Sequence, residues 1–299
     1  MTAAPETVQE IRHAEVDPRI RIFQAGEDVD TFAVLTRRFA VLIDTMSTPA
    51  LMRQVVDMVR PELAGRPLMV VNTHADWDHV YGNVLFTAGS EIPALIVASA
   101  LTRDRLRSPA AQERLSAQRR ESERFSEVDL VAPDVVFEQG LTLDGGDLTL
   151  ELFATPGHTP DHHSVWIPEI RTLLAGDAAE FPFPSVRRGA DLPEVRASLE
   201  RMAALRPAVV LPCHGGTTGP ELLEQNLAYF ERLKQALRGW PERGRPQGEL
   251  DFSALPPSLT YENLLKDLNV TVERVPEFYR RFHSDAVRAT LEELGSEEG

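Results

Sequence analysis

Apolar residues occur in short runs along the first third of the chain, and turn-forming or charged residues separate the runs. Runs rich in β-branched residues, bounded by Gly, Asp or Arg, predict short strands at residues 20–24, 31–35 and 40–43. Apolar positions then repeat at helical spacing over residues 51–59, and an apolar run follows at residues 68–72. The pattern therefore predicts a helix and a further strand after the first three strands.

The rest of the chain keeps alternating between the two patterns. Further strands are predicted at residues 94–98, 135–137, 141–143, 148–154, 164–167, 172–174 and 209–211. Amphipathic helices are predicted at residues 192–205 and 221–237, and a highly charged helical segment, interrupted at Pro109, at residues 100–125. This charged segment is typical of a solvent-exposed face, and the alternative is a cap over an active site.

Four side chains that can bind a metal follow the apolar run at 68–71. They are His74, Asp76, Asp78 and His79. Imidazole suits zinc and iron, whereas carboxylates favour harder ions. The alternative interpretation is a polar loop capped by aspartates, so the cluster alone does not establish a metal site.

Three more strands end in the same way. His158 follows the predicted strand at 148–154, Asp177 follows 172–174, and His214 follows 209–211. Buried strands rarely end in His or Asp unless these side chains are paired or bound to a metal. A fold that brings these strand ends to one edge would gather seven potential ligands, and the sequence therefore predicts a metal centre.

Composition limits the partners that we expect. At 42% hydrophobic and 26% charged residues, the 299-residue chain is typical of a globular protein. Its formal net charge of -15 disfavours nucleic acid as a partner. The single cysteine, Cys213, excludes an internal disulfide. With no recognisable secretory signal and no apolar run of about 20 residues, we expect a cytoplasmic protein without a membrane segment.

Taken together, the histidine and aspartate motifs resemble those of the metallo-β-lactamase superfamily. The family pattern is H-x-H-x-D-H, then Gly-His, Gly-Asp and His-Gly, and here these appear at residues 74–79, 157–158, 176–177 and 214–215. The Thr-Pro-Gly-His-Thr-Pro turn of the family is also present at residues 155–160. The resemblance covers roughly residues 20–237.

This resemblance implies an α/β (α+β) fold, a four-layer αβ/βα sandwich of two mixed β-sheets flanked by helices. We expect a metallo-β-lactamase-like domain at residues 1–238, with its site at one edge between the sheets. Residues 239–299 are expected to form a linker and a C-terminal helical tail, with helices at 261–268, 276–282 and 285–294. The tail could pack over the pocket or form a homodimer contact.

By the same resemblance, His74 and His158 bind a first metal ion, while Asp78, His79 and His214 bind a second. Asp177 bridges the two ions, which are expected to be divalent, with zinc the leading candidate.

One position departs from the family pattern, because Asp76 replaces its second histidine. Either Asp76 binds the metal and moves the preference from zinc toward iron or manganese, or it is too short and the first site is weak, or zinc fills both sites with a mixed ligand set. We favour binding by Asp76, because the flavodiiron branch of the superfamily has a glutamate at this position.

The resemblance also implies a hydrolase that uses a metal-bound hydroxide on an ester, thioester, lactone or phosphoester of a small molecule. Asp78 is the expected catalytic residue, orienting the nucleophile or carrying a proton. True β-lactamases have Cys or Ser at the position of Asp177, so the glyoxalase-II-like and lactonase-like branches are the better match. The alternatives are a di-iron redox protein of the flavodiiron type and a non-catalytic metal-binding protein.

Several further residues are candidates for supporting roles. His162 and Asp44 are expected to contact metal ligands, although a packed histidine and a turn-capping aspartate are equally good interpretations. The candidates for contact with a small-molecule substrate are Tyr81, Phe181, Phe183 and Arg187. Arg187 would bind an anionic group, unless it is part of a solvated surface pair with Arg188.

Overall fold

The structure is a computed structural model that describes residues 7–187, 189–238, 255–268, 270 and 275–297. Its internal contacts divide the chain into two compact units. Unit 1 comprises Met1–Ala154 and Pro160–Leu174, and unit 2 comprises Thr155–Thr159 and Ala175–Gly299. Each unit is described by itself below.

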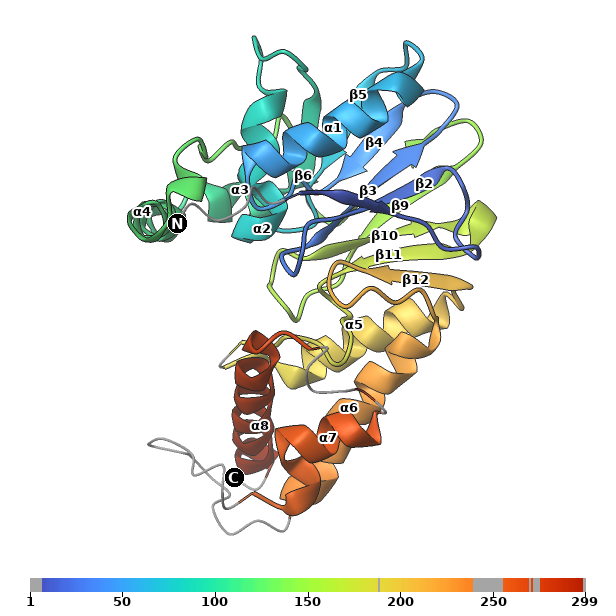
Figure 1. The fold of residues 1–299 in the computed structure, drawn as a ribbon. Coiled ribbons are helices and arrows are strands. Elements are labelled where there is room, and N and C mark those ends of the chain that lie inside the picture. The colour runs from blue at the N-terminus through green and yellow to red at the C-terminus, as the bar shows by residue number, and fades with distance from the viewer. Residues whose placement is uncertain (1–6, 188, 239–254, 269, 271–274, 298–299) are drawn as a thin grey trace. The chain divides into compact units, whose positions relative to one another are not determined.

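Unit 1 contains a seven-stranded sheet whose strands follow one another in chain order within the described residues (Figure 1). Its strands are β1 (Gln9–Ile11), β2 (Ile20–Gln24), β3 (Asp30–Leu35), β4 (Ala40–Ile43), β5 (Leu68–Val71), β6 (Leu95–Ser99) and β7 (Val135–Phe137). Strands β1 to β4 are antiparallel, and β4 to β7 are parallel. The parallel half places the carboxyl ends of β4, β5 and β6 at one edge.

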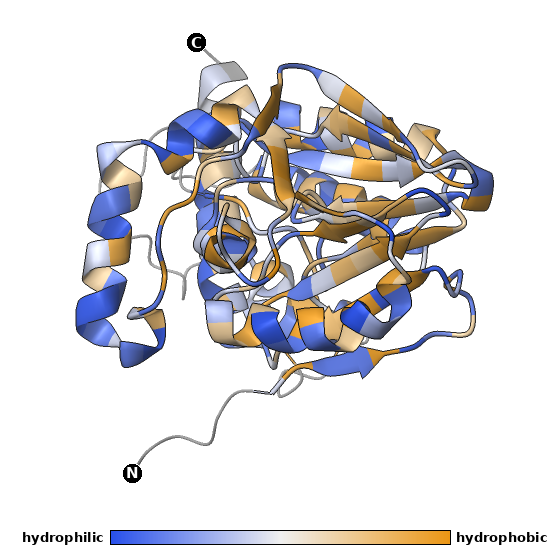
Figure 2. Cartoon of the chain, turned by 90° about the horizontal axis from the view of Figure 1, so that it is seen from above, coloured by the Kyte–Doolittle hydropathy of each residue, from blue (hydrophilic) through white to orange (hydrophobic). Residues whose placement is uncertain are grey.

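The second sheet has the order β12-β11-β10-β9-β8. Its strands are β8 (Gly140–Asp144), β9 (Thr149–Ala154), β10 (His163–Ile167), β11 (Thr172–Gly176) and β12 (Val209–Pro212). Strands β8 and β9 form the expected hairpin, with Gly146 at a φ of 84° in its turn. Figure 2 shows hydrophobic residues concentrated on the strands. The expected fold class, two mixed sheets flanked by helices, is confirmed.

The helices of unit 1 begin at well-defined caps. Helix α1 (Pro49–Leu63) begins at Thr48, whose hydroxyl accepts a hydrogen bond from the Leu51 N–H. The charged segment forms α3 (Ala100–Leu106) and α4 (Pro109–Glu121), so the expected interruption at Pro109 is confirmed. Helix α4 buries only Leu115 of its own residues, and Leu115 packs with Tyr81, Leu106 and Phe125. The short 3₁₀ segments Glu123–Phe125 and Pro168–Ile170 also belong to unit 1.

Unit 2 is mainly helical in the residues described after β11. Its helices are α5 (Leu192–Ala204), α6 (Glu221–Leu237), α7 (Tyr261–Asp267) and α8 (Phe278–Glu297), with a 3₁₀ turn at Pro257–Leu259. The sequence predicted two helices where the structure has α8, and that prediction was wrong. The helix continues through residues 283–284, where the Ser284 hydroxyl donates to the Arg280 carbonyl one turn earlier and so makes no competing contact outside the helix. Most of the expected linker, residues 239–254, lies outside the described residues, and the domain boundary at 238 stays a prediction.

Within the described ranges, no helix is both long and apolar enough to cross a bilayer.

Helix α8 is held within unit 2 by a buried ion-pair network. Glu293 accepts hydrogen bonds from Arg196 of α5 at 3.0 and 2.6 Å and from Lys234 of α6 at 2.8 Å. Burial raises the pKa of Glu293, but the hydrogen bonds and charges of Arg196 and Lys234 outweigh burial and hold that pKa below 4.5. The network therefore stabilises unit 2 above the unfolded pKa and loses this contribution as the pH falls through the folded pKa.

We expect Glu293→Gln to lower the free energy of unfolding at pH 7 by about 2 kcal/mol, because charged hydrogen bonds are lost at a buried position. The difference from the wild type should shrink as the pH falls through the lowered folded-state pKa of Glu293, because the wild-type carboxylate then becomes protonated as well. Urea unfolding at pH 7 and at a strongly acidic pH measures it. The exposed neighbour Glu292→Gln is the control and should change neither value.

Candidate metal centre

The cluster that follows β5 is positioned by the parallel sheet edge. Ile43 of β4 pairs with Val71 of β5, and the Asp44 N–H donates to the Val71 carbonyl at 2.8 Å. The residues just after both strands are therefore held at the same edge. The chain then turns into the short helix α2 (Trp77–Val80) and the 3₁₀ segment η1 (Tyr81–Phe86). A Cβ on Gly82 would lie 2.0 Å from the Thr45 carbonyl oxygen, so only glycine allows this close approach.

The four candidate ligands of unit 1 lie at distances that suit a cation. His74 Nε2 is 3.8 Å from Asp76 Oδ2, and His79 Nε2 is 3.8 Å from Asp78 Oδ2. The rings of His74 and His79 are 4.1 Å apart, and both residues are fully buried. These separations are too long for hydrogen bonds but close to the roughly 3.4 Å between two ligands of a tetrahedral zinc ion. The donor chemistry and spacing therefore fit a divalent cation.

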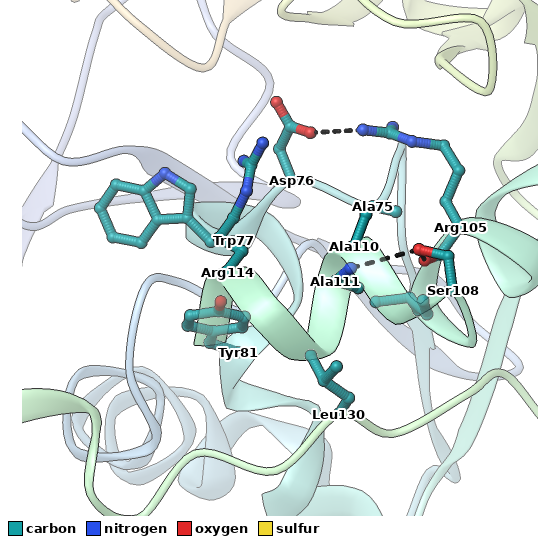
Figure 3. A pocket seen from close by; sticks show the side chains of 11 residues that line it. Ala75, Asp76, Trp77, Tyr81, Arg105, Ser108, Ala110, Ala111, Arg114 and Leu130 are labelled. Atoms are coloured by element: carbon teal, nitrogen blue, oxygen red, sulfur yellow. Dashed lines mark hydrogen bonds and ion pairs between the residues drawn. The ribbon is translucent and has the colours of Figure 1, made fainter. Parts of the chain in front are cut away.

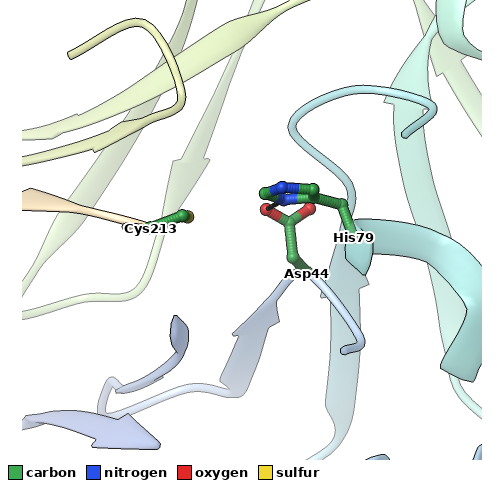
Figure 4. A group of neighbouring side chains, drawn as sticks. All are labelled: Asp44, His79 and Cys213. Carbon is green, nitrogen blue, oxygen red and sulfur yellow. Dashed lines mark hydrogen bonds and ion pairs between the residues drawn. The ribbon is translucent and has the colours of Figure 1, made fainter. Parts of the chain in front are cut away.

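Asp44 contacts His79 directly and is connected to His74 through Thr73. Figure 4 shows the Asp44 carboxylate pointing toward the ring of His79, and its Oδ2 lies 2.8 Å from His79 Nδ1. The same carboxylate accepts hydrogen bonds from the Thr73 N–H and hydroxyl. Because the only hydroxyl proton of Thr73 goes to Asp44, the contact of 2.9 Å between Thr73 Oγ1 and His74 Nδ1 requires Nδ1 to donate. Both imidazoles thus carry their proton on Nδ1 and keep their lone pair on Nε2. The backbone φ of Asp44 is 66°, a conformation usually retained for a functional reason.

The two carboxylate oxygens of Asp76 face different neighbours. Its Oδ1 accepts a hydrogen bond from Arg105 Nη2 of α3 at 2.8 Å, while its Oδ2 is the oxygen that faces His74. Arg105 also contacts the buried Asp161, which accepts a hydrogen bond from the Ala75 N–H at 2.9 Å. Burial lowers the pKa of Arg105, but the charges of Asp161 and Asp76 outweigh it and raise that pKa. Sequence reasoning missed both Arg105 and Asp161, although Asp161 stands inside the histidine turn.

A cavity of about 110 Å³ lies beside Asp76 in unit 1 (Figure 3). Its wall combines aromatic, aliphatic and cationic side chains, among them Trp77, Tyr81, Arg105, Arg114 and Leu130. The Tyr81 hydroxyl donates to Gln118 at 2.6 Å, and burial raises the pKa of Tyr81 to about 12. Tyr81 lines this cavity and stays a protonated hydrogen-bonding group near neutral pH, and its contact with a substrate stays a prediction.

The paired histidines after the turn have different surroundings. His162 is fully buried, with its ring 5.0 Å from that of His74. His163 instead packs edge-on against Phe137, and burial lowers the pKa of His163. Of the two, His162 is the one beside a candidate ligand, and its supporting role stays a prediction.

Unit 2 supplies the other candidate ligands. The Cys213 N–H donates to the Gly176 carbonyl at 3.2 Å, which holds the ends of β11 and β12 together and brings Asp177 beside His214. Asp177 Oδ2 is 3.5 Å from His214 Nε2 and also 3.5 Å from His158 Nε2. One carboxylate oxygen is thus at ligand spacing from two imidazole nitrogens.

A second carboxylate, Glu180, lies close to these ligands and was not anticipated. Glu180, Asp177 and His158 place one ligand-type atom each within 4.8 Å of one another. Burial, reinforced by the nearby charge of Asp177, raises the pKa of Glu180. The only sequence signal was one acidic residue between Ala178, Ala179 and the Phe-Pro stretch that follows.

The structure corrects one of the substrate candidates. Phe183 is fully buried, and its ring stacks on Tyr229 with a centroid distance of 4.7 Å. It packs against residues of α6, α7 and α8 and therefore does not form a pocket rim. Phe181 is half-buried, with its N–H donating to the His214 carbonyl, and Arg187 is exposed. Substrate contact by these two residues stays a prediction.

Comparison with known proteins identifies the family of the chain. The chain matches the family described as the Metallo-beta-lactamase superfamily over residues 26–214. The Beta-lactamase-like protein 2 homolog of Caenorhabditis elegans is 39% identical over 75 residues, which are 25% of this chain and 24% of that protein. This match thus spans about a quarter of the relative's length.

Two solved structures illustrate the likeness of fold. A metallo-beta-lactamase family protein from Thermus thermophilus has a TM-score of 0.62 at 21% identity, covering 97% of this chain and 93% of its own. A metallo-beta-lactamase from Pontibacter korlensis has a TM-score of 0.55 at 21% identity, covering 74% of this chain and 97% of its own. Because the family match covers more than half of the sequence, this chain belongs to the metallo-beta-lactamase superfamily.

Proposed function

We propose that this chain is a metal-dependent hydrolase that cleaves an ester, thioester, lactone or phosphoester bond of a small molecule. Membership of the superfamily supports metal-dependent hydrolysis in general. The observation that carries the proposal is the position of Asp177, whose Oδ2 lies 3.5 Å from both His158 Nε2 and His214 Nε2. A carboxylate oxygen between two imidazole nitrogens is a donor arrangement suited to a divalent cation.

Asp177 also supports the proposed branch of the superfamily. By resemblance, true β-lactamases have Cys or Ser at this position, whereas glyoxalase-II-like and lactonase-like enzymes have Asp. Antibiotic hydrolysis is therefore not the activity that we propose. The structural likeness to the two solved structures described above, each at 21% identity, concerns the fold.

The proposed site residues have two roles: most of them bind the cation, and Asp78 also acts on the nucleophile. When bound, a divalent cation supplies an acidified water molecule and polarises the bond to be cleaved. The proposed ligands in unit 1 are His74, Asp76, Asp78 and His79, and those in unit 2 are His158, Asp177 and His214. Asp78 is only half-buried, so its second oxygen can orient a nucleophile or accept a proton. Zinc is the proposed metal, with iron or manganese favoured to the extent that Asp76 contributes oxygen.

The cavity beside Asp76 is the proposed site for part of the substrate. With about 110 Å³ it can hold a group of only a few non-hydrogen atoms. Its wall offers apolar contacts from Trp77 and Leu130 and a guanidinium from Arg114. This combination suits a short acyl chain or a small anionic group.

The metal set can be tested by removing one ligand from each unit. We expect wild-type protein to bind two divalent ions per chain. His79→Ala should bind about one, because His79 is a ligand of only one proposed ion, and Asp177→Ala should bind one or fewer, because Asp177 is a ligand of both. Each variant should lose at least about 100-fold in kcat/KM on a generic ester or thioester, because ligand loss costs more than loss of a ligand's partner.

Elemental analysis of purified protein measures the ion content. His13→Ala is the control, since His13 lies outside the proposed set, and it should keep both ions. Two ions per chain in either ligand variant would contradict the proposed ligand set.

The unusual Asp76 gives a separate test of metal identity. We expect Asp76→His to shift the preference toward zinc over manganese by about tenfold, because imidazole replaces a hard oxygen donor. Competitive loading of stripped protein with both ions, followed by elemental analysis, gives this ratio. The same change at the exposed Asp104 of α3 is the control. An unchanged ratio in Asp76→His would show that Asp76 is no ligand.

A further inference from the structure

We propose that the C-terminal helix α8 helps to position a ligand of the metal centre. Tyr279 of α8, Glu180 and Ser185 form a hydrogen-bonded chain that fixes the tautomer and orientation of His158. The metal-related part of this inference rests on the proposed function. The family match ends at residue 214, so Tyr279 lies outside the part of the chain that the family describes. The C-terminal tail thereby has a specific role in the chemistry of the site.

The chain of contacts is continuous and buried within unit 2. The Tyr279 hydroxyl donates to Glu180 Oε2 at 2.7 Å. The Ser185 hydroxyl donates to the other oxygen, Glu180 Oε1, and lies 2.8 Å from His158 Nδ1. Tyr279 and Glu180 are each 1% exposed, and Ser185 is 4% exposed. Water therefore does not compete for these hydrogen bonds.

The directions of these hydrogen bonds follow from counting protons. A serine hydroxyl has one proton. With Glu180 ionised, Ser185 gives that proton to Glu180 Oε1, so Ser185 Oγ accepts from His158. The Ser185 carbonyl oxygen, 3.2 Å from the same Nδ1, is also only an acceptor. The proton of His158 must then lie on Nδ1, which leaves the lone pair on Nε2, the atom that faces Asp177. That is the tautomer that binds a cation through Nε2.

Glu180 is fixed on its backbone as well as on its side chain. Its N–H donates to Asn226 Oδ1 at 3.0 Å, and its carbonyl accepts from Asn226 Nδ2 at 2.9 Å. The Ser185 N–H donates to Glu180 Oε1 at 3.1 Å. With this support the carboxylate cannot turn away from Ser185 without losing several hydrogen bonds. Tyr279 supplies the hydrogen bond from α8 to this carboxylate.

A purely structural role for Tyr279 is the competing explanation, because its ring packs edge-on against Phe183 at 5.6 Å. Tyr279→Phe separates the two explanations, since it removes the hydroxyl and keeps the ring. Tyr229→Phe is a matched control. Tyr229 is similarly buried in the same aromatic cluster, but its hydroxyl contacts His283 Nδ1 rather than Glu180.

The first measurement is the dissociation constant for zinc, obtained by chelator competition. We expect Ser185→Ala to raise it about 100-fold and Tyr279→Phe about tenfold, with Tyr229→Phe unchanged. The unfolding temperature of the metal-free proteins separates lost affinity from lost folding. If Tyr279→Phe binds zinc as tightly as the wild type, or if Tyr229→Phe weakens it equally, the proposal is overturned.

The second measurement does not depend on metal. Nitrogen-15 NMR of histidine-labelled, metal-free protein, with the His158 signal assigned through His158→Asn, reports which ring nitrogen carries the proton. We expect Nδ1–H in the wild type and in Tyr229→Phe, and a shift toward Nε2–H in Ser185→Ala. An Nε2–H tautomer in the wild type would overturn the inference. If the tautomer is as expected but the wild type binds no zinc, the proposed function fails and the hydrogen-bonded chain stands.

Discussion

The structure depends on buried carboxylates that fix the protonation of imidazoles. In unit 1, Asp44 accepts from the Thr73 hydroxyl, which accepts in turn from His74. In unit 2, Glu180 accepts from the Ser185 hydroxyl, which accepts from His158. Each relay consists of an acid, a hydroxyl and an imidazole, and each leaves the lone pair on Nε2. A buried carboxylate is costly unless it is fully hydrogen-bonded, so both acids are tied into the backbone as well.

In both units, the pairing of strand ends positions the donor side chains. The parallel pairing of β4 and β5 sets Asp44 next to the turn that contains His74 and His79. The hydrogen bond between Cys213 and Gly176 does the same for Asp177 and His214. Within each unit, strand pairing thus decides the separation of donors that are far apart in the sequence.

Much of this arrangement could be predicted from the sequence, because apolar runs and the polar residues that end them are local signals. Strand β1 was missed since Gln9 and Glu10 carry no apolar pattern. Arg105, Glu180 and Tyr279 were missed because their roles come from tertiary contacts with residues 29 to 99 positions away. Phe183 was misassigned for a related reason: proximity to Asp177 in sequence does not determine which way a side chain points. The roles of the ligands rest on the resemblance, and their sharing of ions stays a prediction.

Helix α4 has a property that follows from its thin contact with the rest of unit 1. It buries only Leu115 of its own residues, and it is also held by the hydrogen bond between Gln118 and Tyr81 and by hydrogen bonds from Arg119 to the Phe125 and Val128 carbonyls. Segments that bury little apolar surface open locally at a lower free energy than the whole domain unfolds. Ala110, Ala111 and Arg114 of α4 form one wall of the cavity, so the size of the cavity depends on polar contacts of α4 more than on its apolar packing.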